Sequence, residues 1–556
     1  MPDETLQMLT DSVDRLVTSH GFAEALVEWA AAIGPQNVLS EYDDLTEVRQ
    51  ATIPDPASCS AVLRPETSEH VQQIVRIANQ FQIPLYPISQ GKNWGYGDAS
   101  PTTDNQVIVD MSQMNRVIEV NEDLAYAVIE PGVTQQQLFE YVDDKNIPLW
   151  IDPTGAGPNA SLLGNALERG YGITPYGDHF ATICGLDVVL PTGQMLKTGF
   201  GHFDNAKAHR LFPNGVGPAL DGMFTQSNFG IVTRMGLWLM PRPEHFELCL
   251  FSIDDDQLLP QLIEKTRYLK LHRIVQGSIN LVSRNRALTV IQQFPWDEMQ
   301  SQTPMSDQVA QQIADQYGVG IWNGVCGLYG PKDLVRSQKK IIKQQLKPFC
   351  RRVSFISQST VNTISRFPRI VSVSTGLNAS ALLSAIRPAF GLLSGIPNEA
   401  ALNTAYWRKK IEVPTENLDP KRDGCGLIWY APVLPMNHTS VEEFQRIAEP
   451  ILHKFGFDFC MTLTTVTARA FDCTLPILFD RTNDEDVSRA KRCYEELLDT
   501  CANNGFFPYR VHSKSMSALQ NRSKSYWEFC ETIKNSIDPD GIISPGRYQP
   551  QSVDNV

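Results

Sequence analysis

Hydrophobic residues in the first part of the chain follow two spacings, one typical of helices and one typical of strands. Residues 67–82 carry apolar side chains at helical intervals, namely Val71, Ile74, Val75, Ala78 and Phe81. This spacing predicts an amphipathic helix. Residues 83–88 predict a short buried strand, and the β-branched runs at 106–111 and 125–129 predict two more. Thr134 is the predicted N-cap of a helix that runs to about residue 144.

The same patterns continue toward the C-terminus. Residues 185–190 and 194–198 flank the turn Thr192-Gly193 and predict a hairpin, and residues 228–240 predict another strand. Between about 245 and 500, longer helical patterns alternate with strands. The last of these helices, residues 487–504, is predicted to end at Gly505.

These elements predict an α+β protein with more than one domain, as the length of 556 residues also indicates. We divide the chain into an N-terminal helical extension (1–54), a first domain (55–244), a second α+β domain (245–500) and a C-terminal segment (501–556).

Charge and cysteine usage narrow the class of protein. With 48 Lys and Arg against 62 Asp and Glu, the formal net charge is −14, which disfavours binding to nucleic acids or to anionic membranes. We find no apolar window long enough for a transmembrane helix and no secretory signal at the N-terminus, so we expect a cytoplasmic protein. The eleven cysteines are scattered singly, which is typical of free thiols, and the ten dispersed histidines predict no metal site.

Residues 89–97, S-Q-G-K-N-W-G-Y-G, form a glycine-rich loop after a predicted strand. Three glycines allow backbone N–H groups to converge on an anion such as a phosphate. The loop matches neither the Walker pattern nor G-x-G-x-x-G. A plain tight turn is the alternative interpretation.

A second candidate region spans residues 163–180, L-G-N-A-L-E-R-G-Y-G-I-T-P-Y-G-D-H-F. Its small residues recur where a flat cofactor could lie against the backbone. His179 within it is interpreted either as a catalytic residue or as an ordinary polar core residue.

Taken together, these motifs resemble the vanillyl-alcohol oxidase / p-cresol methylhydroxylase flavoprotein family. The matching stretches are 87–97 (P-I-S-Q-G-K-N-W-G-Y-G), 130–133 (E-P-G-V), 163–180, 227–233 (S-N-F-G-I-V-T), 478–483 (L-F-D-R-T-N), 508–511 (P-Y-R-V) and 542–547 (I-I-S-P-G-R). They occur in order from about residue 55 to 550, and they are most similar to the phenol-oxidising branch, which includes eugenol oxidase.

The resemblance implies a p-cresol methylhydroxylase-type fold, in which a two-part domain (55–244) binds FAD and an α+β cap (245–500) covers the flavin ring. Residues 501–556 are then expected to return to the FAD domain. By the same resemblance, the residues expected to surround FAD are Ser89, Gly91, Lys92, Asn93, Trp94, Gly95, Tyr96, Gly97, Gly164, Asn165, Gly177, Asp178, Ile231 and Arg547.

The resemblance also implies a substrate site in which Tyr96, Tyr509 and Arg510 bind a phenolate. A free phenol has a pKa of about 10, and a cation within about 4–6 Å lowers such a pKa by roughly 1–3 units. The phenolate then loses hydride from its benzylic carbon to flavin N5 and becomes a quinone methide. Expected substrates are 4-alkylphenols, 4-hydroxybenzyl alcohols and allylphenols. The alternative for Tyr509-Arg510 is a surface connection between a helix and a strand.

The sequence departs from the family pattern at one of the two positions that link flavin covalently. Gly426 stands where vanillyl-alcohol oxidase has its flavin-linking His, so we expect no link of that kind. Tyr406 lies near the region where p-cresol methylhydroxylase uses a Tyr, and it is interpreted either as a linking residue or as a buried Tyr beside a basic turn.

Further departures concern the substrate side chain. Asp472 takes the place of one of the family's paired histidines, either as a base or as a capping residue. Ala156 and Ile173 stand where vanillyl-alcohol oxidase has an Asp and a Tyr, and Ile428 is placed in the substrate pocket. We therefore expect an altered substrate range or an altered step after hydride transfer.

Two other functions stay open at this point: oxidation of another alcohol or a 2-hydroxy acid by the same flavin, and a flavin-bound lyase or isomerase without net redox chemistry. The resemblance implies a phenolic small molecule as substrate, oxygen or an electron-transfer protein as electron acceptor, and a homodimer.

Overall fold

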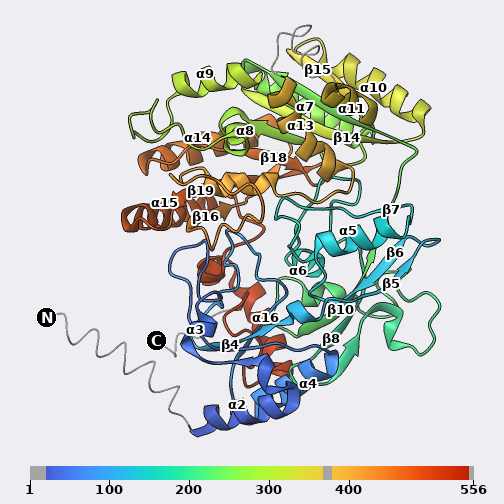
Figure 1. Ribbon diagram of the computed structural model, residues 1–556, viewed down its shortest axis with the longest axis vertical. Helices are drawn as coiled ribbons and strands as arrows, with labels where there is room; N and C mark the ends of the chain where they lie inside the picture. Colours follow the sequence, from blue (N-terminus) through green and yellow to red (C-terminus); the bar gives the residue numbers. More distant parts are fainter. Residues whose placement is uncertain (1–19, 367–378, 550–556) are drawn as a thin grey trace, which may run out of the picture.

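The computed structural model describes residues 20–366 and 379–549 of the chain. Figure 1 shows two bodies stacked along the long axis. The N-terminal half, in blue and cyan, forms the lower body, and the residues from about 245 to 500, in green to orange, form the upper one. The C-terminal helix α16 (Lys524–Ile537) lies with the lower body.

The first sheet of the lower body has the order β1-β2-β4-β3, with β2, β4 and β3 parallel. Its strands are β1 (Val38–Leu39), β2 (Cys59–Leu63), β3 (Leu85–Ile88) and β4 (Gln106–Asp110). Parallel strands need a crossover, and α4 (Ser68–Phe81) supplies it between β2 and β3. Thr67 caps α4 by accepting a hydrogen bond from the N–H of His70, and α2 (His20–Ile33) packs against it. The helix predicted for 67–82 and the strands predicted nearby are confirmed.

The second sheet is antiparallel, in the order β5-β6-β10-β8-β9. Its strands are β5 (Val117–Asn121), β6 (Tyr126–Ile129), β8 (Ile183–Val189), β9 (Met195–Lys197) and β10 (Ile231–Trp238). Helix α5 (Gln135–Asp144) begins with a capping box in which Thr134 and Gln137 satisfy each other's backbone N–H groups. Short elements complete this half, namely α3 (Tyr42–Leu45), β7 (Leu149–Trp150), α6 (Leu162–Leu167) and β11 (Met240–Pro241). The predicted hairpin is β8–β9.

The upper body is built on an eight-stranded antiparallel sheet. Its strands are β12 (His245–Ile253), β13 (Asn280–Ser283), β14 (Trp322–Gly330), β15 (Arg352–Ser357), β16 (Cys425–Tyr430), β17 (Val433–Pro435), β18 (Thr462–Thr465) and β19 (Ala470–Asp480). Its helices are α7 (Leu259–Leu271), α8 (Arg284–Ile291), α9 (Asp307–Tyr317), α10 (Lys332–Leu346), α11 (Gln358–Arg366), α13 (Ala379–Leu393), α14 (His438–Lys454) and α15 (Asp484–Asn503). The 3-10 helix η6 (Ala400–Tyr406) precedes β16.

The largest hydrophobic core lies between this sheet and helices α7, α10, α14 and α15. Helix α15 begins three residues before the predicted start, because the side chain of Asn483 accepts the N–H groups of Glu485 and Asp486. Ala51 and Ile53, which we assigned to the N-terminal extension, belong to this core. The extension therefore contributes to the upper body as well as to the lower one.

The C-terminal segment joins the lower body by backbone pairing and by a buried ion pair. Ile543 forms a parallel bridge with Leu85 of β3. The ammonium of Lys534, in α16, donates to the carbonyl oxygen of Asn228 (2.6 Å) and pairs with Asp538 (2.5 Å). These contacts place residue 543 beside β3, the strand that leads into the glycine-rich loop. Among the described residues, no helix has the length and apolar character that crossing a bilayer requires.

Candidate active site

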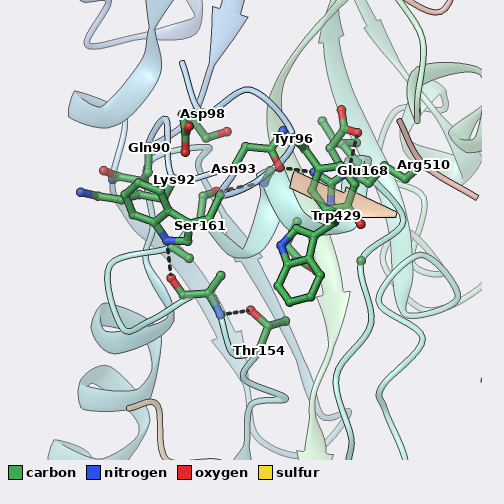
Figure 2. Close-up of a pocket in the computed structure, with 18 of the residues that line it drawn as sticks. Gln90, Lys92, Asn93, Tyr96, Asp98, Thr154, Ser161, Glu168, Trp429 and Arg510 are labelled. Atoms are coloured by element: carbon green, nitrogen blue, oxygen red, sulfur yellow. Dashed lines mark hydrogen bonds and ion pairs between the residues drawn. The ribbon is translucent and has the colours of Figure 1, made fainter. Parts of the chain in front are cut away.

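A cavity of about 420 Å³ lies where the two bodies meet. Its walls come from the loop after β3, from residues 154–173, from the start of β10, from the cap strands β13, β18 and β19, and from the segments around residues 509–510 and 543–547. Sites between domains are a frequent location for cofactors and small ligands. Figure 2 shows part of this cavity.

The glycine-rich loop forms one wall and leaves its backbone donors unused. The structure records no acceptor within the described residues for the N–H groups of residues 90–94. Unpaired N–H groups in a turn are suited to bind an anion such as a phosphate. Gly91 adopts a φ of 60°, which a residue with a side chain rarely does.

The loop is held in place by Asp98, which also lines the cavity. Its carboxylate accepts a hydrogen bond from the hydroxyl of Thr52 (2.7 Å), and that hydroxyl accepts one from the N–H of Gly95 (2.8 Å). Burial raises the pKa of Asp98 to about 7. Gly95 itself does not line the cavity but supports it, with a φ of 76° and the indole of Trp429 directly above its Cα.

We predict that Gly95→Ala destabilises the holoenzyme more than Gly505→Ala. Both glycines have positive φ, which costs about 1–2 kcal/mol for alanine. A Cβ at Gly95 would lie 2.4 Å from Trp429 Cδ1, whereas one at Gly505 would meet no atom within 4 Å. Overpacking adds about 1–3 kcal/mol at Gly95 only. Thermal midpoints of the two variants test this, and equal losses would contradict it.

Most residues predicted to surround the cofactor or substrate do line the cavity. They are Ser89, Gly91, Lys92, Asn93, Trp94, Tyr96, Ala156, Gly164, Asn165, Ile173, Ile231, Asp472, Tyr509, Arg510 and Arg547. Segments far apart in the sequence therefore converge on one site.

Four of the predicted cofactor residues lie behind the wall instead. Gly95 and Gly97 pack against Trp429 and Ser513, respectively. The backbone of Asp178 forms an antiparallel bridge with that of Tyr171. A Cβ at Gly177 would lie 2.6 Å from the carbonyl oxygen of Gly172. Gly177 and Asp178 thus support the lining segment around residues 170–173 rather than forming the wall.

His179 is a polar core residue, the second of its two interpretations. Its ring nitrogens bond to Asn165 Oδ1 (2.6 Å) and to Asp152 Oδ2 (2.9 Å). Asp152 also accepts the N–H of Thr174 (3.1 Å). The pair fixes the loop around residue 174 and does not line the cavity.

Ile428 does not lie in the cavity either. The side chains of a strand alternate between its two faces, and in β16 Leu427 and Trp429 face the cavity while Ile428 joins the hydrophobic core of the cap. Gly426 shares the core face, where a Cβ would meet the ring of Phe479. Position 426 therefore faces away from the cavity.

Tyr406 is fully buried beside the cavity but does not line it. Its hydroxyl donates to Asp423 Oδ2 at 2.6 Å, and burial together with this carboxylate raises the pKa of Tyr406. A hydroxyl used in this way is a structural anchor for η6, which favours the buried-Tyr interpretation.

Tyr96, Tyr509 and Arg510 come together at one end of the cavity. The guanidinium carbon of Arg510 lies 4.1 Å from the ring centre of Tyr96, and an Nη of Arg510 donates to Asn93 Oδ1. The ring of Tyr509 meets the ring of Tyr171 edge-on at 5.7 Å. Figure 2 shows Tyr96, Asn93 and Arg510 grouped beside Glu168.

Glu168 organises the charges at this end. Its carboxylate lies 3.2 Å from Nε of Arg510, also pairs with Arg547, and accepts a hydrogen bond from the hydroxyl of Tyr548 (3.1 Å). Two guanidinium groups thus share one carboxylate. The excess positive charge is available to an anionic ligand.

The two tyrosines remain neutral and can donate hydrogen bonds. Burial raises the pKa of both Tyr96 and Tyr509 above the ordinary value for a phenol, and the nearby Arg510 offsets this only in part. Protonated phenols beside a guanidinium are suitable partners for a bound phenolate oxygen.

Asp472 faces this group from β19. It is buried, and no hydrogen-bond partner is recorded for its Oδ1. Burial raises the pKa of Asp472 to about 7, although the positive charge of Arg510 acts in the opposite direction. An unpaired carboxylate that titrates near neutral pH can accept a proton from a ligand.

Sequence reasoning missed several residues that line the cavity. They are Glu168, Tyr171, Asn280, Arg286, Trp429, Thr462, Thr464 and Thr474. Glu168 and Tyr171 lie inside the 163–180 motif, so a closer reading of that motif could have found them. The cap residues carry no such motif, because strand register alone brings them to the cavity.

Within the described residues, no group of three or more His, Cys, Asp or Glu side chains is arranged to hold a metal ion.

Comparison with known proteins identifies the family. Residues 59–199 match the family model described as "FAD binding domain". The chain is 35% identical to the 1'-carboxy-chondrochloren decarboxylase of Chondromyces crocatus, covering 94% of this chain and 96% of that protein. It is 31% identical to the 4-cresol dehydrogenase [hydroxylating] flavoprotein subunit of Pseudomonas putida, covering 96% of each. The crystal structure of p-cresol methylhydroxylase with substrate bound superposes with a TM-score of 0.86, at 30% identity and with 97% and 98% of the two chains covered.

The chain belongs to the vanillyl-alcohol oxidase / p-cresol methylhydroxylase flavoprotein family. The predicted fold, an FAD-binding domain of the p-cresol methylhydroxylase type with an α+β cap, is confirmed. FAD is the cofactor of this flavoprotein. The unused N–H donors of residues 90–94, in the wall of the cavity, fit a dinucleotide with its pyrophosphate on the glycine-rich loop.

Proposed function

We propose that this flavoprotein oxidises para-substituted phenols at the benzylic carbon. The observation that carries the proposal is the convergence of Tyr96, Tyr509 and Arg510 at one end of the cavity, with an excess positive charge and two neutral hydroxyl donors. Two relatives, named as a 4-cresol dehydrogenase and as p-cresol methylhydroxylase, act on a phenol of this kind.

In this proposal Tyr96, Tyr509 and Arg510, which we call the clamp, first bind the substrate as a phenolate. Arg510 lowers the pKa of the bound phenol by roughly 1–3 units, and Tyr96 and Tyr509 donate hydrogen bonds to its oxygen. Asp472 accepts the phenolic proton, or the proton of a side-chain hydroxyl, because its carboxylate is unpaired and close to the clamp. The ring and the para side chain of the substrate then extend along the cap strands.

When bound, FAD supplies the two-electron acceptor that takes the benzylic hydrogen as hydride at flavin N5, and it is the only oxidant that the reactions proposed here need. The remaining quinone methide adds water, or an alcohol substrate loses its hydroxyl proton to give an aldehyde. Oxygen or an electron-transfer protein is the proposed final acceptor.

Anaerobic mixing tests this function with a matched pair of compounds. We expect 4-ethylphenol to bleach the flavin absorbance and 4-ethylanisole, its methyl ether, to leave it unchanged, since only the phenol can form an oxyanion in the clamp. If neither 4-alkylphenols nor 4-hydroxybenzyl alcohols bleach the flavin, or if the ether reacts as fast as the phenol, the proposal is wrong.

A second outcome, oxidative decarboxylation, is favoured by the 35% identity to a decarboxylase. It requires a phenol whose carboxylate is attached to the carbon next to the benzylic carbon. After hydride loss, the bond to the carboxylate breaks and its electron pair forms the side-chain double bond, while the quinone methide becomes a phenolate again. The products are a vinylphenol and carbon dioxide, which product analysis distinguishes from an alcohol or aldehyde.

A further inference from the structure

A second cation lines the cavity in the cap, away from the phenolate clamp. Arg286 belongs to α8, directly after the cap strand β13. Its Nη1 donates to the hydroxyls of Thr404 (2.7 Å) and Thr289 (2.9 Å). Neither Nε nor Nη2 of Arg286 has a hydrogen-bond partner among the described residues. These two nitrogens form one edge of the guanidinium group.

This guanidinium has no carboxylate partner in the described part of the chain. Arg510 and Arg547 share Glu168, and Arg284, two residues before Arg286, pairs with Asp307 at 2.5 Å. No such ion pair involves Arg286. The pKa of Arg286 is affected by the thiol of Cys460, but burial raises the pKa of that thiol, so the thiol stays neutral. An uncompensated charge of this kind is costly unless a ligand neutralises it.

Strand register places Arg286 at the opposite end of the cap surface from the clamp. Asp472 pairs with Thr464, and Thr464 pairs with Asn280. Two residues further along, Thr462 pairs with Val282, and β13 then leads into α8. Two residues of strand span about 7 Å. Cavity-lining polar side chains, Asn280, Thr464 and Thr462, thus lie between Asp472 beside the clamp and Arg286.

We propose that Arg286 binds a carboxylate at the end of the substrate's para side chain. The substrate class is therefore a phenol with an acid group, such as a 3-(4-hydroxyphenyl)propanoate, whose phenolate and carboxylate are held at opposite ends of the cavity. The free Nε–Nη2 edge suits a carboxylate because two parallel N–H groups match its two oxygens. This inference rests on the proposed phenol oxidation.

Two compounds that differ only in the acid group test the proposal in the wild-type holoenzyme. We expect the acid, 3-(4-hydroxyphenyl)propanoate, to be oxidised with a catalytic efficiency about 10- to 100-fold higher than that for 4-propylphenol. A factor of this size is what hydrogen bonds to a charged group contribute to binding. Binding is measured independently of turnover with 4-hydroxycinnamate and 4-vinylphenol, which lack an sp³ benzylic carbon, through their perturbation of the flavin spectrum. The acid is expected to bind more tightly by a similar factor.

Variants at Arg286 separate a carboxylate-binding role from a structural one. Arg286→Gln is expected to abolish the preference for the acid in both turnover and binding, and Arg286→Lys to retain part of it. Arg284→Gln removes the same charge from the same helix and is expected to keep the preference intact. If wild-type enzyme oxidises 4-propylphenol without preferring the acid, or if Arg286→Gln impairs both compounds equally, this inference is wrong while phenol oxidation stands. If neither compound reduces the flavin, the proposed function itself has failed.

Discussion

Replacing Arg510 by alanine is expected to slow the reduction of the flavin by 4-ethylphenol by about a hundredfold to a thousandfold. The guanidinium carbon lies 4.1 Å from the ring centre of Tyr96, and its positive charge acts on the hydroxyls of both Tyr96 and Tyr509. Removing one member of a buried charge pair costs about 2–5 kcal/mol. Without Arg510, Glu168 and Arg547 neutralise each other, so no excess positive charge remains to stabilise a phenolate.

Two further variants make this result interpretable. Arg510→Lys keeps the charge but not the planar fork, so we expect an intermediate rate. Arg522→Ala removes a surface guanidinium that pairs with Asp499, and it is expected to react like the wild type. Each variant is compared at equal FAD content. An Arg510→Ala enzyme that retains the wild-type rate would exclude the proposed role of this residue.

The second large effect concerns Asp472 and pH. Its pKa of about 7 means that the carboxyl is protonated below neutral pH and ionised above it. If the ionised form accepts the substrate proton, kcat/KM rises with pH and levels off above about 7. Asp472→Asn cannot accept the proton, so we expect a rate lower by about 10²- to 10⁴-fold and the loss of this pH dependence.

Asp98 provides the matched control, since burial raises its pKa to about 7 as well. Although Asp98 also lines the cavity, its carboxylate is already bonded to Thr52 and holds the glycine-rich loop, so it is not expected to take a proton from the substrate. Asp98→Asn should therefore keep the pH dependence of kcat/KM. If the rise near pH 7 disappears in Asp98→Asn and persists in Asp472→Asn, the role assigned to Asp472 is wrong.

The raised pKa of Asp472 also determines how its contribution to the stability of the folded protein changes with pH. In the unfolded chain an aspartate has a pKa of about 3.9, so between pH 4 and 7 the folded protein binds more protons at Asp472 than the unfolded protein does. The contribution of this group to stability is therefore present at low pH and is lost as the pH rises toward 7. Asp472→Asn removes this part of the pH dependence, whereas the part due to Asp98, whose pKa is also raised to about 7, remains.

Local sequence signals predicted the elements that carry the site, because caps and periodicity act over a few residues. Thr67 and Thr134 begin their helices as expected, and Gly505 follows the end of α15. The glycine-rich loop and the Tyr509-Arg510 pair were found through ordered motifs. The loop and the pair meet in one cavity because the chain has the family fold, and the motifs indicated that family.

Side-chain direction in the cap and ion pairing between distant segments could not be predicted in the same way. Ile428 was placed in the pocket by position, but strand alternation directs it into the cap core. Glu168 became important only once Arg510 and Arg547, which lie 342 and 379 residues away in the chain, were seen on either side of it. Arg286 reaches the cavity through the register of β13, which depends on pairings with β14 and β18.

The most direct test of the central claim is the ionisation state of a phenol bound to the holoenzyme. We propose titrating 4-hydroxybenzaldehyde, whose phenolate absorbs at longer wavelength than the neutral phenol, into the enzyme over a range of pH. We expect the bound phenol to titrate roughly 1–3 pH units below the free compound and Arg510→Ala to abolish this shift. A bound phenol whose pKa equals or exceeds that of the free compound would contradict it.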